Sequence, residues 1–199
     1  RKKAPEKSDA EKNELLMRSS ELVLMLSGKL KSAVDSEEWS RKTYYETEQP
    51  LISVLSLMER TGAGVSVPAL REASERFGEG MERLEKKAFE EAGCEFNIAS
   101  PKQVGEIIYG RLGVEPQKKT GSGQNSTKED ILSDLAPTVP LAGTVLEWRG
   151  LAKLRGTYSD VLPELIDHVT GRVHTSFNQA GTSTGRLSSS DPNLQNIPA

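Results

Sequence analysis

Apolar residues recur every three or four positions along much of this chain, a spacing that predicts α-helices. One helix is predicted over about residues 14–31, and a second begins at Pro50 and ends before Gly62. A longer helix follows Pro68, with one apolar stripe formed by Leu70, Ala73, Phe77, Met81, Leu84 and Ala88. Residues 1–13 are charged, which predicts a frayed start, and the polar stretch 35–49 is interpreted as a connector.

Two shorter helices are predicted on either side of a lysine-rich loop. Residues 100–103 combine a Ser N-cap, a Pro at the first helical position and a Gln that could close a capping box, so a helix is expected from there to Leu112. Ser126 is a second predicted N-cap, for a helix ending at Leu135. The intervening loop, residues 116–128, contains three lysines and no acidic residue. The pattern therefore predicts a helix-loop-helix with a positively charged tip.

A last helix is predicted from Leu141, with Pro163 as a kink or an end. Its apolar positions include Tyr158, whereas three basic side chains are expected to be available outward: Arg149, Lys153 and Arg155. After Asp167 the composition changes abruptly to Ser, Thr, Asn and Gln, with three charged residues in 168–199. This C-terminal polar segment predicts a turn at 170–171, a strand over 172–178 and a turn at 190–193.

Composition sets wider limits on the protein class. The chain has 199 residues, 26 basic and 29 acidic side chains, and a formal net charge of −3, which is compatible with one large domain or two small ones. The longest apolar run, residues 22–26, is far shorter than the roughly 20 residues of a membrane span. Cys94 is the only cysteine, so no internal disulfide can form. We therefore expect an intracellular protein without membrane segments, in the cytoplasm if its source is bacterial and in an organelle or the nucleus if it is eukaryotic. We also expect a monomer.

Several catalytic motifs are excluded by their spacing. Gly181 and Gly185 are separated by three residues and followed by Arg-Leu, so they do not form a phosphate-binding P-loop. His168 and His174 have no partner at metal-ligand spacing, and no Ser/His/Asp arrangement of known spacing occurs. The serines at 188–190 are expected to satisfy nearby backbone groups.

The polar segment nevertheless concentrates hydrogen-bond donors in a region with one acid, Asp191. Every base pair presents acceptors in the minor groove of DNA, at purine N3 and pyrimidine O2, so donors placed there can test pair geometry without selecting a sequence. The donors at issue are Arg186, Asn193, Gln195 and Asn196. Composition alone favours the other interpretation, an ordinary polar loop whose Asn and Asp residues form turns.

Two runs of sequence resemble a known protein family, and this resemblance favours the DNA-binding interpretation over an ordinary polar loop. Residues 184–198, Thr-Gly-Arg-Leu-Ser-Ser-Ser-Asp-Pro-Asn-Leu-Gln-Asn-Ile-Pro, and residues 171–179, Gly-Arg-Val-His-Thr-Ser-Phe-Asn-Gln, resemble the signature of family A DNA polymerases, the bacterial DNA polymerase I group. Upstream, residues 151–158, 100–104 and 49–55 resemble the thumb region of the same family in the right order. The similarity extends over about residues 45–199.

The resemblance implies a mainly α fold. Residues 47–167 would be a helical thumb with a helix-loop-helix tip, and residues 168–199 the first β-strands of a truncated α+β palm. Residues 1–46 would be the end of an exonuclease-like domain or a linker. The first residue is Arg, and we expect the chain to be a piece of a longer protein.

The resemblance also implies two sets of contacts to primer–template duplex DNA. A thumb must slide along DNA, so it should grip phosphates rather than bases. The expected backbone contacts are Lys118, Lys119, Asn125, Ser126, Thr127, Lys128, Arg149, Lys153, Arg155, Thr157 and Tyr158. The expected contacts at the minor groove and the primer–template end are Arg186, Asn193, Gln195, Asn196, Thr182 and Thr184.

The resemblance further implies that polymerisation uses two Mg²⁺ ions held by carboxylates, with a dNTP as the second substrate. Asp191 is the one acid in residues 168–199 and precedes Pro192, which favours a turn role. We therefore expect the metal ligands to lie beyond Ala199, so that these 199 residues alone are inactive in nucleotide addition. Two alternatives remain: a non-catalytic DNA-binding protein derived from a polymerase thumb, and a helical module whose long apolar stripe packs on a partner.

Overall fold

The computed structural model describes residues 8–116 and 125–197, which are mainly helical with one two-stranded sheet, β1 (Ser176–Asn178) and β2 (Ser188–Ser190). The mainly α fold class is confirmed. Contacts divide the chain into two compact units. One comprises residues 1–60 and 177–187, and the other comprises 61–176 and 188–199. Each unit is described separately below.

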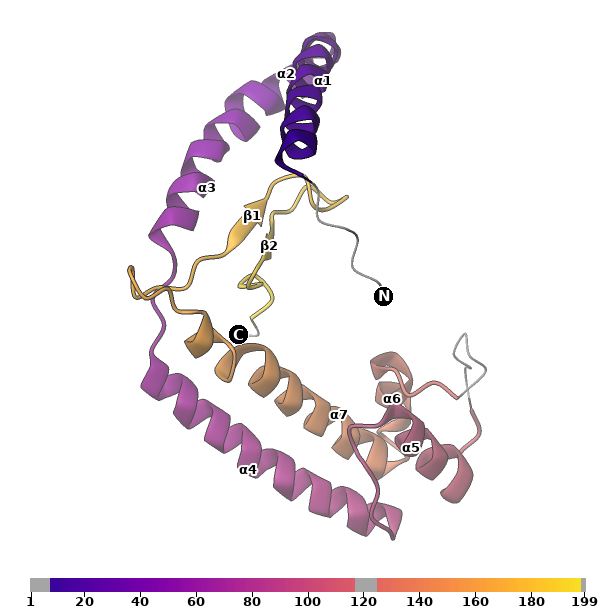
Figure 1. The fold of residues 1–199 in the computed structure, drawn as a ribbon. Helices are drawn as coiled ribbons and strands as arrows, with labels where there is room; N and C mark the ends of the chain where they lie inside the picture. The colour runs from indigo at the N-terminus through magenta and orange to yellow at the C-terminus, as the bar shows by residue number, and fades with distance from the viewer. Residues whose placement is uncertain (1–7, 117–124, 198–199) are drawn as a thin grey trace. The chain divides into compact units, whose positions relative to one another are not determined.

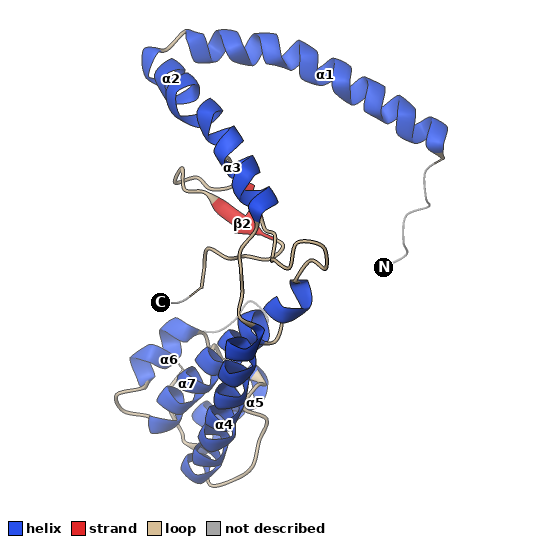
Figure 2. Ribbon diagram, turned by 90° about the vertical axis from the view of Figure 1, so that its left-hand side faces the viewer, coloured by secondary structure: helices blue, strands red, loops and turns tan. Residues whose placement is uncertain are grey.

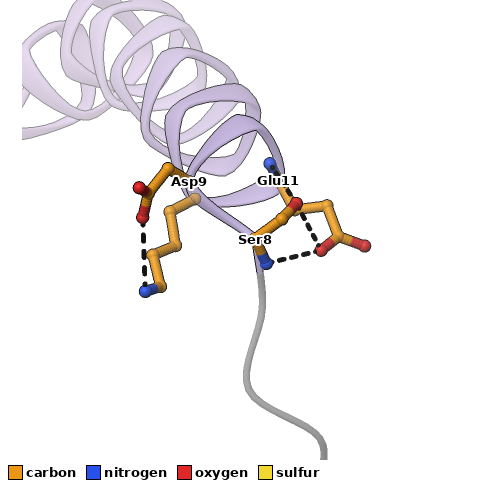
Figure 3. A network of polar contacts seen from close by, with 4 residues as sticks. Ser8, Asp9 and Glu11 are labelled. Atoms are coloured by element: carbon orange, nitrogen blue, oxygen red, sulfur yellow. Dashed lines mark hydrogen bonds and ion pairs between the residues drawn. The ribbon is translucent and has the colours of Figure 1, made fainter.

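The first unit opens with α1 (Asp9–Asp35), which begins earlier than predicted. The Ser8 Oγ accepts the Glu11 N–H at 3.4 Å, and a Glu11 carboxylate oxygen accepts the Ser8 N–H at 2.8 Å (Figure 3). This capping box satisfies two backbone N–H groups that would otherwise be unpaired at the start of the helix. The hydrogen bond from the Ser8 backbone is also the main reason that the pKa of Glu11 is lowered. The expectation of a frayed start is therefore wrong from Asp9 onward.

The apolar positions of α1 are exposed rather than buried. The helix has no buried residue, and its exposed apolar side chains include the predicted positions Leu15, Leu22, Val23, Leu26 and Leu30. The periodicity thus predicted the helix correctly, but it did not identify what the stripe packs against.

The predicted connector is helical. It consists of α2 (Glu38–Thr43) and a π-helical turn (Tyr44–Glu48), which continues directly into α3 (Gln49–Thr61). Its tryptophan, Trp39, is 73% exposed. Within α3 the buried residue is Leu55. The prediction of a connector was wrong because these polar residues carry no apolar period, although their backbone forms α-helical and π-helical hydrogen bonds.

The second unit is built on two long helices that lie side by side, α4 (Val67–Ala92) and α7 (Pro140–Leu154) (Figure 1). The helix predicted after Pro68 is confirmed as α4, which buries Leu84 and Ala88 of the predicted stripe. It begins one residue earlier, at Val67, and Ser66 is its N-cap, which the sequence analysis did not identify. It ends at Gly93, whose φ of +68° is the left-handed conformation that glycine adopts most readily.

The main core lies at one end of these helices, where α5 (Pro101–Gly105), the π-helical turn Glu106–Arg111 and α6 (Glu129–Leu135) gather (Figure 2). Its most deeply buried side chains are aliphatic: Ile98, Val104, Ile108, Ile131, Leu132, Leu141 and Val145. Each such side chain contributes about 1.5–3 kcal/mol when fully buried. The helix-loop-helix therefore rests on a well-packed base.

Both predicted caps of the helix-loop-helix differ in detail. Ser100 caps α5 as expected, but the Gln103 side chain accepts the N–H of Asn97, at 2.6 Å, and not that of Ser100. The N-cap of α6 is Lys128, so the helix begins later than the Ser126 cap predicted. The Ser126 Oγ accepts the Lys128 N–H at 3.4 Å instead.

Beyond α7 the chain forms a π-helical turn (Arg155–Ser159) and a 3₁₀ turn (Leu162–Leu165). A second small core combines Tyr158, Leu162 and Val173. The strand predicted over 172–178 is confirmed for β1 alone, because Val173 forms isolated bridges with Ala63 and Ile166 instead.

The predicted turn at 170–171 is confirmed. A carboxylate oxygen of Asp167 accepts the N–H groups of Val169 and Thr170, at 3.0 and 2.7 Å, and Gly171 has a φ of +67°. The bond from the Thr170 backbone is the main reason that the pKa of Asp167 lies below its usual value.

Candidate nucleic-acid interface

The end of the lysine-rich loop, residues Asn125–Lys128, is held by buried polar contacts, and we call it the tip flank. The Tyr109 hydroxyl donates to the Ser126 carbonyl at 2.6 Å, and the side chains of Ser126 and Thr127 are buried. Lys128 is exposed. Lys118 and Lys119 lie outside the described residues. The structure thus brings Lys128 to the surface next to a fixed backbone.

Arg149 is part of the same network and is not available outward as the sequence suggested. Its Nη1 donates to the Thr127 carbonyl at 2.5 Å, and its Nη2 lies 3.4 Å from the Thr127 Oγ1. The side chain is half-buried, and this burial lowers the pKa of its guanidinium. Helical periodicity placed Arg149 on a polar face of α7, but it could not show that the tip flank covers that face.

Arg155 is likewise engaged within the second unit. Its Nε donates to the Ser74 Oγ at 3.2 Å and pairs with a carboxylate oxygen of Asp160 at 3.3 Å. Lys153 and Thr157 are exposed. Of the three basic residues expected on the outward side, Lys153 is therefore the one that is exposed and has no polar partner among residues 8–116 and 125–197.

Tyr158 and the C-terminal turn are connected directly. Tyr158 is 8% exposed, and its hydroxyl donates to the Asn196 carbonyl at 2.6 Å. The Ser189 Oγ accepts the N–H groups of Leu194 and Gln195, at 3.0 and 3.1 Å, as predicted for these serines. Tyr158 therefore stabilises the turn rather than presenting its hydroxyl to solvent.

Three amide side chains project from this turn. The side-chain oxygen of Asn193 accepts the N–H groups of Gln195 and Asn196, at 3.0 and 3.2 Å, which fixes the turn as an Asx-type motif. Because this oxygen is occupied, the NH₂ group is the part of Asn193 that can donate to a ligand. The side chains of Asn193, Gln195 and Asn196 are exposed.

An open depression of about 490 Å³ adjoins the turn. Thr157, in the π-helical turn after α7, and Val161 line one side of it, and Asp191 and Asn193 line it from the C-terminal turn. Asp191 is exposed and stands in the predicted turn, with a φ of +57°. Thus Thr157 and Asn193, which sequence analysis assigned to different contact sets, share one concave surface.

The remaining predicted groove residues lie in the segment Gln179–Leu187 of the first unit, which we call the Arg186 loop. Arg186 and Thr184 are exposed, and Gly185 adopts a left-handed φ of +73°. The half-buried Thr182 donates its hydroxyl to the Arg186 carbonyl at 2.7 Å and so closes the loop. The Arg186 side chain itself is exposed.

Sequence reasoning missed the contacts that hold this loop. The Gln179 Nε2 donates to the Glu48 carbonyl at 3.0 Å and to a Glu48 carboxylate oxygen at 2.8 Å. A carboxylate oxygen of Glu59 accepts the Phe177 N–H at 2.6 Å. More than a hundred residues separate the partners in each pair, so no local pattern could have indicated them.

The described residues contain no cluster of three or more His, Cys, Asp or Glu that could hold a metal ion. The ligands for the two Mg²⁺ ions implied by the sequence resemblance were expected beyond Ala199, and that expectation stays a prediction. Within the same residues, no helix combines the length and apolarity required to cross a membrane. What the arrangement offers chemically is donors and positive charge: Lys128, Lys153, Arg186 and three amides at the surface.

Comparison with known proteins gives a consistent result. Residues 67–199 match the family described as DNA polymerase family A. DNA polymerase I of Pseudomonas aeruginosa is 49% identical over 154 residues, which cover 77% of this chain and 17% of that protein. The thermostable DNA polymerase I of Thermus aquaticus is 45% identical over 166 residues, covering 83% of this chain and 20% of that protein.

A solved structure is also similar. The POL domain of Pol1 from M. smegmatis, in complex with DNA primer-template and dNTP, has a TM-score of 0.71 and 32% sequence identity. The match covers 84% of this chain and 29% of that one. The chain thus spans about a fifth or less of the length of the two curated relatives.

Proposed function

Because this chain belongs to DNA polymerase family A, we propose that it serves template-directed DNA synthesis by holding the primer–template duplex. In that proposal, residues 47–167 act as the thumb, residues 168–199 as the start of the palm, and residues 1–46 as the end of an exonuclease-like domain or a linker. The similar M. smegmatis structure, whose description names primer-template DNA and dNTP, supports DNA as the partner.

The observation that carries the proposal is the exposed set of donors in the C-terminal polar segment. Arg186, Gln195 and Asn196 are exposed, and Asn193 has its NH₂ group available while its oxygen holds the turn. Donors of this kind match the acceptors that all base pairs share in the minor groove. Each would hold a base pair of normal shape better than a distorted one, independently of sequence.

The second part of the proposal is a grip on the phosphate backbone. Lys128 and Lys153 are exposed, and Lys118, Lys119 and Asn125 belong to or adjoin the same basic loop. Neutralising phosphates releases counterions, which gives affinity without sequence preference and permits sliding. Arg149 instead holds the tip flank through Thr127, and Ser126 holds it through Tyr109 and Lys128. We assign Arg155 and Tyr158 a supporting role elsewhere in the second unit, where they contact Ser74 and Asn196.

Metal chemistry is not assigned to these residues. In the proposed polymerase, Mg²⁺ would activate the primer hydroxyl and stabilise the leaving pyrophosphate of the dNTP. The ligands for these ions are expected beyond Ala199, and the contribution proposed for this chain is positioning of the duplex.

A segment exchange tests the proposal. The 154 matched residues of the P. aeruginosa DNA polymerase I are replaced by the corresponding residues of this chain. We expect the chimaera to extend a primer, and Arg186→Ala within it to slow extension from matched ends more than it weakens overall DNA binding. A chimaera that binds the duplex but extends no primer would favour the non-catalytic DNA-binding alternative.

The phosphate grip has its own test. Lys128→Ala should reduce the slope of log affinity against log salt by about 0.9, the value for one lost phosphate contact on duplex DNA. Lys42→Ala, at an exposed lysine of α2 that belongs to neither predicted contact set, serves as the control and should leave the slope unchanged. Equal slopes for the wild type and Lys128→Ala would refute the assignment.

A further inference from the structure

The Arg186 loop is fixed to α3 by residues that belong to none of the proposed contact sets. Its first residue, Gln179, is half-buried and donates one amide nitrogen to both the backbone carbonyl and the carboxylate of Glu48, at 3.0 and 2.8 Å. Glu48 is the last residue of the π-helical turn that precedes α3. One glutamine thereby ties the start of the loop to the start of a helix.

A second carboxylate, this one within α3, accepts a hydrogen bond from the neighbouring strand β1. Glu59 accepts the Phe177 N–H at 2.6 Å, two residues before Gln179. Glu48 and Glu59 are eleven residues apart, which is about three helical turns, so both lie on one face of the helix. Leu55, the buried residue of α3, lies on that face between them. The face that buries an apolar side chain is thus also the face that receives the two donors.

Two separate hydrogen bonds order the backbone between Gln179 and Arg186. The Asn178 side chain accepts the Ala180 N–H at 2.9 Å, which sets the turn after the anchor. Two residues further on, Thr182 donates its hydroxyl to the Arg186 carbonyl at 2.7 Å. If the entry to the loop were released, Thr182 would move with it, and the backbone that carries the Arg186 guanidinium would lose its support.

We propose that Gln179 and Glu48 are positioning residues for Arg186. Their contact orients the loop so that the guanidinium meets the minor groove at the primer end, while neither residue touches DNA. The proposal rests on the groove-contact role given to Arg186 above. The π-helical turn before α3 would thus help to recognise the geometry of the terminal base pair indirectly, by holding the loop that carries Arg186.

The test compares affinities for a fluorescein-labelled primer–template duplex whose terminal pair is matched or mismatched. Four forms of the chain are used: wild type, Gln179→Met, Arg186→Ala and the double variant. Met has a similar length but no donor, so it removes both bonds to Glu48 with little change in volume. Gln49→Met is the matched control, because it removes the same amide from α3, where the Nε2 donates to the Tyr44 hydroxyl at 3.0 Å.

We expect Arg186→Ala to reduce the matched-to-mismatched affinity ratio about tenfold, and Gln179→Met to reduce it about three- to tenfold. The double variant should be no worse than Arg186→Ala, because a positioning residue has no effect once its target is absent. Gln49→Met should keep the wild-type ratio. A purely structural role for Gln179 would instead lower both affinities equally and leave their ratio unchanged.

Glu59 provides a second pair of variants in case Gln179→Met folds poorly. Glu59→Gln keeps an oxygen that can accept the Phe177 N–H and should retain the ratio, whereas Glu59→Leu should lower it. A normal ratio in both Gln179→Met and Glu59→Leu, together with a reduced ratio in Arg186→Ala, overturns this inference alone. An unchanged ratio in Arg186→Ala overturns the proposed groove contact itself.

Discussion

The tip flank and the Arg186 loop are both short polar segments, but they use their arginines in opposite ways. In the tip flank, the half-buried Arg149 donates inward to the Thr127 carbonyl and supports buried backbone. In the Arg186 loop, the arginine is exposed, and neutral or acidic side chains do the supporting: Gln179, Glu48 and Thr182. A basic residue near a proposed DNA surface is therefore not by itself a DNA contact, because its donors can already be committed to the fold.

Among the variants that distinguish the tip flank from the Arg186 loop, Arg149→Met is expected to have the largest effect on the free energy of unfolding. It leaves the Thr127 carbonyl without its charged donor, and hydrogen bonds to charged groups contribute about 1.5–3 kcal/mol, so the free energy of unfolding should fall by about 2–3 kcal/mol. Urea unfolding of the chain measures it. Lys153→Met, an exposed lysine on the same helix, is the control and should stay within about 0.5 kcal/mol of the wild type. Equal losses of unfolding free energy in Arg149→Met and Lys153→Met would contradict the supporting role of Arg149 in the tip flank.

Arg186→Ala, in contrast, should weaken DNA binding and leave the stability of the fold nearly unchanged. Its side chain is exposed, so the free energy of unfolding should change by less than about 0.5 kcal/mol, whereas binding to a primer end should weaken by about 1–3 kcal/mol. Duplex affinity and urea unfolding are measured on the same preparation. Arg41→Ala, an exposed arginine of α2, should change neither quantity. A stability loss as large as that of Arg149→Met would remove the distinction between the segments.

Tyr109→Phe should have a smaller effect on the tip flank. It removes the hydroxyl that donates to the Ser126 carbonyl, and one neutral hydrogen bond contributes about 1 kcal/mol to stability. Burial raises the pKa of Tyr109 above its ordinary value of 10.0, so its contribution is complete below that pH and is lost as the pH rises through the folded-state value. Unfolding measured across alkaline pH should therefore show a decline in the wild type that the variant lacks.

The smallest effect is expected at Asp167, whose carboxylate organises the turn before the polar segment. Its pKa is lowered chiefly by the bond from the Thr170 backbone, so its stabilisation is present above the ordinary value of 3.8 and is lost as the pH falls through the lower folded-state value. The Thr170 amide resonance should follow this titration. In Asp167→Asn the acid transition of that resonance should disappear, and a transition at or above 3.8 in the wild type would contradict the assignment.

Local sequence determined much of the fold because caps, periodicity and turn residues act over a few positions. The helix after Pro68, the Ser100 cap and the turn at 170–171 were all predicted from such short-range rules. The serine that supports the C-terminal turn was predicted in the same way. The helical connector was not, since its polar residues carry no apolar period.

Only the tertiary structure decided which polar side chains remain available. Arg149 and Lys153 have similar sequence surroundings on α7, yet one is covered by the tip flank and the other is exposed. Likewise, nothing near Gln179 in the sequence indicates Glu48, because the pairing depends on how α3 packs against a segment far along the chain. A side chain's local pattern sets its helix face, but its partners are set by whatever the rest of the chain brings to that face.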